Sequence, residues 1–157
     1  NTMEIKTELT ADTDDAAYNC GRLLAVFDDL QQRAHEWKLE GATIIERYFA
    51  AASTAPMSAF GILWRLHFHH LKKLTRLGDK GKAAAAAIEM KIASICARFG
   101  QTEEMRAKKL PPEFPRTLDL QGQGRFALGF YQEVAASAAA RQASRKNNDT
   151  NPETRTK

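Results

Sequence analysis

Apolar residues recur at intervals of three or four along most of this 157-residue chain, a spacing that is typical of amphipathic α-helices. Segments rich in glycine, proline or charge separate the periodic stretches, and no stretch alternates as a strand does. The pattern therefore predicts an all-α fold, a single-domain bundle of about five helices. The predicted helices cover residues 15–37, 43–53, 56–77, 83–99 and 118–145.

Capping residues mark where the first two helices should begin. Asp12, Thr13 and Asp14 can accept the free backbone N–H groups at the start of the first helix. Thr43 and Glu46 form a capping box, in which each side chain satisfies one N–H group of the second helix. Both signals place a helix start within a residue or two.

Glycine interrupts the helical pattern in two different ways. Gly21 lies inside the apolar pattern of the first helix and suggests a close helix crossing there. Residues 78–82, with two glycines, form a predicted loop, and residues 101–117 are expected to be mostly loop with one turn at 103–108. The predicted organisation is a flexible N-terminus at 1–12, a helical domain at 13–145 and a disordered tail at 146–157.

Residues 60–77 show two opposite faces when they are wound as a helix. The apolar face needs a partner helix and consists of Phe60, Leu63, Trp64, His67, Leu71 and Leu74. The opposite face, the cationic stripe, consists of Arg65, His69, Lys72 and Arg76. A face of one charge sign without an acid is less common than a mixed one, so it is a candidate anion-binding surface. The alternative is a solvated helix surface without a ligand.

Composition and charge narrow the class of protein. Hydrophobic residues make up 43% and charged residues 27%, which fits a soluble globular domain. The net charge of +4 divides into −5 for residues 1–60 and +9 for residues 61–157, and this favours an anionic partner for the second part. No apolar run is long enough for a membrane span. We interpret Cys20 and Cys96 as buried free thiols in a reducing cytoplasm, with a disulfide as the less favoured alternative.

The basic residues that follow the stripe extend the candidate surface. Gly78 and Gly81 can expose backbone N–H groups beside two lysines, an arrangement that suits a phosphate. Such contacts bind the nucleic-acid backbone regardless of sequence, and few aromatic residues accompany them for base stacking. The candidate nucleic-acid-binding residues are Arg65, His69, Lys72, Lys73, Arg76, Lys80, Lys82, Lys91, Arg98 and Arg125.

Three other groupings do not predict a catalytic or metal site. His67 and His70 can converge on a helix, but His69 points away from them, and no acid lies within a turn to complete a metal shell. The glycines at 122 and 124 lack the preceding strand of a phosphate-binding loop. No nucleophile and base share a recognisable spacing. We expect no enzymatic activity, no metal and no cofactor.

Three segments, in this order, resemble a known family. They are residues 17–26 (AYNCGRLLAV), 43–56 (TIIERYFAAASTAP) and 121–131 (QGQGRFALGFY), with Phe114, Pro115 and Leu118 before the third. They are similar to the C-terminal region of the large subunit of type I-C CRISPR interference complexes. A separate chain of this size resembles the small subunit that this subtype makes by internal translation from the large-subunit gene.

The resemblance implies a helical, non-catalytic small subunit of a Cascade-type complex in the cytoplasm, which serves antiviral defence. Such a subunit lies along the guide-RNA filament, supports the target strand and helps to hold the displaced strand. The implied partners are the backbone and large subunits, guide RNA, both DNA strands and other copies of the chain, but no membrane. Arg22 and Arg47 lie within the matching segments, as salt-bridged supports or, less favoured, as phosphate ligands.

Two competing functions remain at this point. One is a helical protein–protein adaptor without direct nucleic-acid contact, whose two oppositely charged parts serve assembly. The other is a metal-dependent nuclease built on the histidines. The leading interpretation is a sequence-independent nucleic-acid-binding subunit of a CRISPR ribonucleoprotein.

Overall fold

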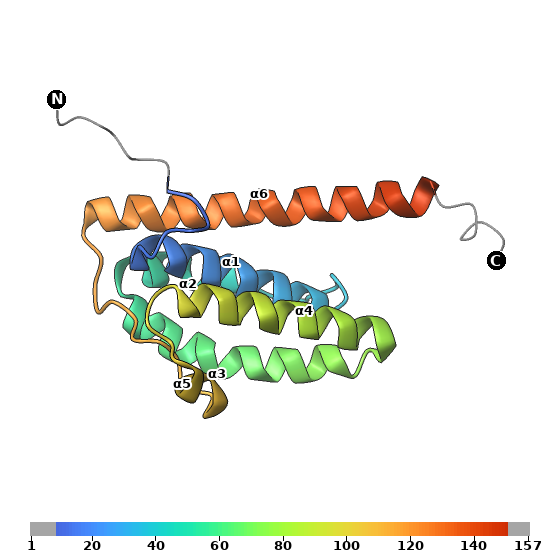
Figure 1. Cartoon of the computed structure of the whole chain (residues 1–157), viewed down its shortest axis with the longest axis horizontal. Coiled ribbons are helices and arrows are strands. Elements are labelled where there is room, and N and C mark those ends of the chain that lie inside the picture. Colours follow the sequence, from blue (N-terminus) through green and yellow to red (C-terminus); the bar gives the residue numbers. More distant parts are fainter. Residues whose placement is uncertain (1–8, 151–157) are drawn as a thin grey trace.

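The computed structural model describes residues 9–150, and within them the chain forms helices and no strand (Figure 1). This arrangement confirms the predicted all-α, single-domain bundle. Besides the expected helices it contains α5, which is the single turn predicted near residues 103–108. The helices are α1 (Ala16–Ala34), α2 (Ile44–Thr54), α3 (Pro56–Thr75), α4 (Gly78–Ala97), α5 (Glu103–Ala107) and α6 (Leu120–Thr150).

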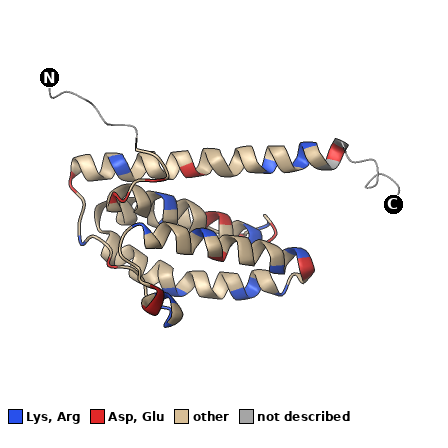
Figure 2. Cartoon of the chain, viewed as in Figure 1, with Lys and Arg blue, Asp and Glu red and all other residues tan. Residues whose placement is uncertain are grey.

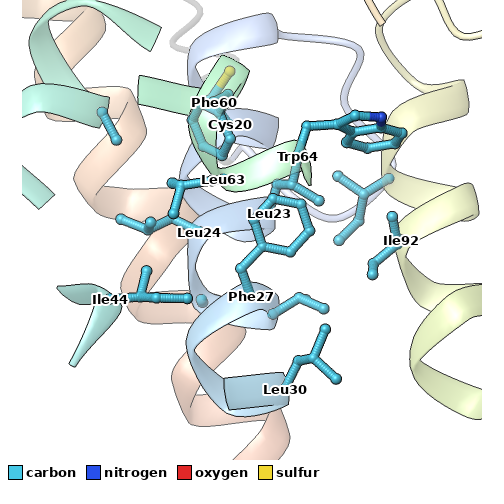
Figure 3. Packing of buried hydrophobic residues seen from close by; sticks show 14 of the residues in the cluster. Cys20, Leu23, Leu24, Phe27, Leu30, Ile44, Phe60, Leu63, Trp64 and Ile92 are labelled. Atoms are coloured by element: carbon cyan, nitrogen blue, oxygen red, sulfur yellow. The ribbon is translucent and has the colours of Figure 1, made fainter. Parts of the chain in front are cut away.

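Helix α1 lies at the centre and contacts α2, α3, α4 and α6. Its apolar side chains point toward residues from three of these helices, including Ile44 of α2, Leu63 of α3 and Ile92 of α4 (Figure 3). Cys20 and Cys96 are buried in the same core as free thiols, and burial raises the pKa of both. The central position of α1 explains why so much of its surface is buried.

Glycines allow α1 and α6 to lie side by side at close range. A methyl group on Gly21 would overlap the backbone carbonyl of Phe126, and one on Gly129 would overlap that of Tyr18. The two helices run in the same direction, with α6 along one edge of the molecule and the other helices on one side of it (Figure 1). The close crossing that the sequence predicts at Gly21 is therefore confirmed.

The first helix boundary differs slightly from the prediction. The α1 cap is Asp15, whose carboxylate accepts a hydrogen bond from the Tyr18 backbone N–H at 2.9 Å. The Thr13 hydroxyl accepts from the Asp15 backbone N–H instead, and Asp12 and Asp14 pair with Arg98, the residue that follows α4. The predicted capping group was therefore wrong, because its members have other partners.

The structure contains the Thr43 contact of the capping box that was predicted at the start of α2. The Thr43 hydroxyl accepts a hydrogen bond from the Glu46 backbone N–H at 3.2 Å. Pro56 occupies the first turn of α3, as its missing N–H allows. These local signals therefore placed the starts of α2 and α3 correctly.

The loop predicted at residues 78–82 is wrong. Helix α4 begins at Gly78, whose positive φ of 86° completes the tight turn after α3. Gly81 is buried, and a methyl group there would overlap the Leu74 backbone carbonyl. Glycine here permits close packing between two consecutive helices, where the sequence pattern indicated a loop.

Helix α6 extends beyond its predicted end. It begins at Leu120, where Asp119 accepts a hydrogen bond from the Gly122 backbone N–H at 2.7 Å, and it continues to Thr150. Residues 146–150 are thus helical, contrary to the predicted disordered tail, because extending an established helix adds one hydrogen bond for each residue. Residues 1–8 and 151–157, covered by the two terminal predictions, lie outside the described residues.

Candidate nucleic-acid interface

Helix α3 separates an apolar face from a cationic face, as its sequence predicts. All six residues of the apolar face are buried in the core. The four residues of the cationic stripe, Arg65, His69, Lys72 and Arg76, are all exposed. No Asp or Glu occurs in α3, so the stripe has no acid of its own helix beside it (Figure 2).

The two arginines and the lysine of the stripe have no ion-pair partner in the part of the chain that the structure describes. Among all ion pairs found there, none includes Arg65, Lys72 or Arg76. Lys80 and Lys82 are likewise exposed and unpaired there. These five cations are therefore available to an external anion.

Lys80 and Lys82 extend the stripe onto the start of α4. No side chain caps this helix start, so its first backbone N–H groups have no side-chain acceptor. The positive end of the helix dipole lies at the same point, and Asp79 is the one acidic residue in the first turn. The turn from Arg76 to Lys82 therefore places three cations and a helix N-terminus together.

Four of the ten candidate residues lie elsewhere or already have partners. The Lys73 ammonium lies 3.1 Å from Nδ1 of His35, at the end of α1. Arg98 pairs with Asp12 and Asp14 at 3.4 and 3.8 Å. The others are Lys91, which pairs with Glu133, and Arg125, which pairs with Asp15 at 3.1 Å. The structure does not bring these four residues onto the stripe.

A buried carboxylate connects three helices. The Glu133 side chain of α6 is 4% exposed, accepts a hydrogen bond from Arg22 Nε of α1 at 3.1 Å and pairs with Lys91 of α4. Arg22 is therefore a salt-bridged support, as the sequence favoured. Arg47 is exposed and has no ion pair among the described residues.

The histidines of α3 divide between the core and the surface. His67 is buried and stacks on Phe27, with ring centroids 4.8 Å apart. Burial lowers the pKa of both His67 and His70 to about 4, so both are neutral at pH 7. Only His69 belongs to the exposed stripe. Within residues 9–150 no group of three or more His, Cys, Asp or Glu residues could hold a metal ion.

Trp37 and three arginines form a second cationic group, which is partly exposed and which the sequence reasoning missed. Trp37 follows α1 and is 55% exposed. The Arg33 and Arg141 guanidinium carbons lie 6.0 and 5.5 Å from its ring centroid. Both arginines also line an open groove of about 450 Å³ between α1, α4 and α6, together with Arg145. The available signal was a tryptophan among the polar residues Glu36, Lys38 and Glu40.

A comparison with models of known protein families identifies the family of this chain. The family model described as CRISPR-associated protein (Cas_Csd1) matches residues 1–138. The chain belongs to the Cas_Csd1 family. A search of curated proteins gave no match.

The Cas_Csd1 match includes the central features of the fold. It covers α1 to α5, the cationic stripe and α6 as far as residue 138, so the segments that resemble the CRISPR large subunit lie within it. Membership of a CRISPR-associated family supports a role in a CRISPR complex. Across the described residues, no helix is both long and apolar enough to span a bilayer.

Proposed function

We propose that this chain is the non-catalytic small subunit of a type I-C CRISPR surveillance complex in the cytoplasm. In this role it supports the hybrid of guide RNA and target strand and holds displaced single-stranded DNA. Its basic surface contacts phosphates without reading sequence. Its proposed partners are the backbone and large subunits and other copies of itself, as in the complexes that its sequence resembles.

The observation that carries the proposal is the unpaired cationic stripe of α3. Arg65, Lys72 and Arg76 are exposed, and the helix that presents them has no acidic residue. Lys80 and Lys82 continue the positive charge past the turn. An extended row of cations without intramolecular partners suits a polyanion better than a single small anion, because it matches repeated phosphates.

Salt-dependent binding tests the proposal. In the triple variant Arg65→Ala, Lys72→Ala, Arg76→Ala, affinity for single-stranded DNA should fall equally for any sequence. Each phosphate contact contributes about −0.7 to the slope of log affinity against log salt, so the slope should become shallower by about 2. Lysine in place of both arginines should keep most of the slope, since a phosphate accepts a point charge. Fluorescence anisotropy of labelled oligonucleotides at several salt concentrations measures both quantities.

A control variant with the same loss of charge separates a specific path from net charge. Arg47, Lys108 and Arg116 are exposed and lie on α2, after α5 and before α6. Changing these three to Ala should alter the slope far less than the stripe variant does. Equal effects of the two triple variants would assign the binding to overall charge and contradict the proposed path.

A separate surface favours the alternative of a protein–protein adaptor. The outer face of α6 carries Leu120, Tyr131 and Val134, which are 82%, 63% and 41% exposed. These positions share one side of the helix, and no charged residue lies on that side between Leu120 and Val134. Exposed apolar surface of this kind is a mark of protein interfaces.

The two functions differ in one measurement. An adaptor without nucleic-acid contact shows no affinity for single-stranded DNA above background at low salt. The proposed subunit binds DNA and also co-purifies with a guide-RNA complex. Cleavage of labelled DNA with divalent metals, abolished by His67→Ala and His70→Ala, would instead indicate the nuclease that the proposal excludes.

A further inference from the structure

The turn that follows α1 holds Trp37 in a strained and exposed position. Both Glu36 and Trp37 have positive φ, 54° and 61°, in a region that bulky residues rarely adopt. The turn is nevertheless fixed, because the Trp37 backbone N–H donates to the Gln32 carbonyl at 2.8 Å and that of Lys38 donates to His35 at 3.0 Å. Such strain persists where the surrounding structure maintains it, and it concentrates at binding sites.

Two arginines lie over the indole ring, and one carboxylate holds them in place. Asp29 accepts hydrogen bonds from Arg33 at 2.9 Å and from Arg141 at 3.3 Å. The guanidinium groups lie 6.0 and 5.5 Å from the Trp37 centroid, and 55% of the residue still remains exposed. The exposed part of Trp37 is therefore accessible to a ligand, and two positively charged groups of fixed position lie over its ring.

The groove that begins at these arginines keeps a positive charge. Arg33, Lys91, Arg141 and Arg145 line it, with alanines of α4 and α6 between them. Asp29 is its one acidic lining residue, and it serves both Arg33 and Arg141. Lys91 pairs with Glu133, and the same carboxylate also pairs with Arg22. Positive charge thus exceeds the negative charge that compensates it.

We propose that Trp37 and this groove bind an unpaired nucleotide of a single-stranded nucleic acid. The base stacks on the indole, and the adjoining phosphate lies in the groove near Arg141 and Arg145. A stacking aromatic beside a basic groove is the arrangement by which proteins bind single strands without a sequence preference. The cations favour this ligand over a protein partner. The site lies between α1, α4 and α6, apart from the outer face of α3 (Figure 1).

This inference rests on the proposed function and adds a base contact that the stripe does not supply. The test therefore compares two 12-mers with the same number of phosphates, oligo-dT and an abasic strand. Stacking on an aromatic residue is worth ~1–3 kcal/mol per base, so the intact chain should bind oligo-dT about 5- to 150-fold more tightly. Oligo-dT should also quench tryptophan emission, because Trp37 is exposed whereas Trp64 is buried.

Variants assign the effect to one residue. Trp37→Leu should remove the preference for oligo-dT over the abasic strand, and Trp37→Phe should retain most of it. Tyr131→Leu is the matched control, since Tyr131 is an exposed aromatic residue on the outer face of α6. Arg145→Gln should make the salt slope shallower by about 0.7 for both strands, through the loss of one phosphate contact.

Each outcome has a distinct meaning. Equal binding of the two strands without quenching would overturn the stacking site and leave phosphate binding by the stripe intact. An absence of binding to either strand at low salt would overturn both proposals. Loss of protein partners in Trp37→Leu, with an unchanged preference for oligo-dT, would place Trp37 in a protein interface and overturn the inference.

Discussion

Gly21 on α1 faces the backbone carbonyl of Phe126 on α6 so closely that no side chain fits between them. Gly129 on α6 has the same relationship with Tyr18 on α1. Because backbone atoms cannot move aside as a flexible side chain can, the two helices would have to separate to accept even a methyl group. The contact between α1 and α6 thus depends on two glycines from different helices.

Substitution of these glycines should destabilise the fold. We expect Gly21→Ala and Gly129→Ala each to lower the free energy of unfolding by ~1–3 kcal/mol, through overpacking and helix displacement. Gly61→Ala and Gly124→Ala are matched controls, because a methyl group at either position meets nothing within 4 Å. These controls should gain up to ~1 kcal/mol from helix propensity. Urea unfolding followed by circular dichroism measures the stability of all four variants. A stability change of the same sign in the two pairs of variants would contradict the close contact.

The buried carboxylate of Glu133 gives a second prediction. Glu133→Gln keeps the shape of the side chain but leaves Arg22 and Lys91 without their anionic partner. Breaking a buried ion pair in this way should cost about 3 kcal/mol. Glu104→Gln is the control, since the exposed pair of Glu104 with Lys108 should contribute less than ~1 kcal/mol. Similar unfolding midpoints for the two variants would mean that Glu133 has little structural role.

The buried histidines make stability depend on pH. Burial depresses the pKa of His67 and His70 to about 4, below the ordinary value of 6.5, so the unfolded chain binds more protons between these values. Each histidine should therefore cost about 2 kcal/mol of stability between pH 7 and pH 5. Asp28 acts in the opposite direction, because burial raises its pKa to about 6 and the folded chain then gains protons first. Protonation of Asp28 should therefore restore about 1 kcal/mol of stability between pH 7 and pH 5.

Urea titrations at pH 7 and pH 5 test this balance. The intact chain should lose stability at the lower pH, and His67→Gln should lose less, because its side chain does not titrate. Asp28→Asn should lose more than the intact chain does, since the compensating group is gone. A stability that is the same at both pH values in all three proteins would show that these groups do not have the shifted pKa values.

Core and surface positions of similar chemistry should respond differently to truncation. Leu63→Ala and Phe126→Ala remove fully buried side chains, and each should cost ~2–5 kcal/mol. Leu120→Ala is the control, because Leu120 is almost completely exposed and should change stability by less than ~0.5 kcal/mol. Thermal unfolding of the three variants provides the comparison, and a small effect at both core positions would contradict the assignment of the helix faces.

The sequence predicted the helix faces well because amphipathic periodicity is a local property. The apolar face of α3 and the opposite stripe follow from spacing alone, as does the cap at Thr43. Glycine was harder to interpret, since Gly78 makes a turn whereas Gly81, three residues later, packs inside a helix. Both glycines suggested a loop from the sequence alone.

Long-range pairing was beyond the reach of sequence reasoning. Arg125 pairs with Asp15, which is 110 residues away, and Lys91 shares Glu133 with Arg22. The charge of such residues is visible in the sequence, but their partners depend on how helices pack. The same limit hid Trp37, because its exposure depends on the turn after α1 and its cationic neighbours include Arg141 of α6.

The reliance of α1 on α6 has a consequence for synthesis on the ribosome. Arg22 and Glu133 are 111 residues apart, so at ~5–20 residues per second α6 emerges roughly 6–22 s after the helix that it covers. During that interval the nascent chain presents the α6-facing side of α1, with Gly21 and Tyr18, uncovered to chaperones and to neighbouring nascent chains. Closure of the bundle therefore waits for the last helix to be translated, and a ribosome that stalls before α6 would leave α1 without its principal partner.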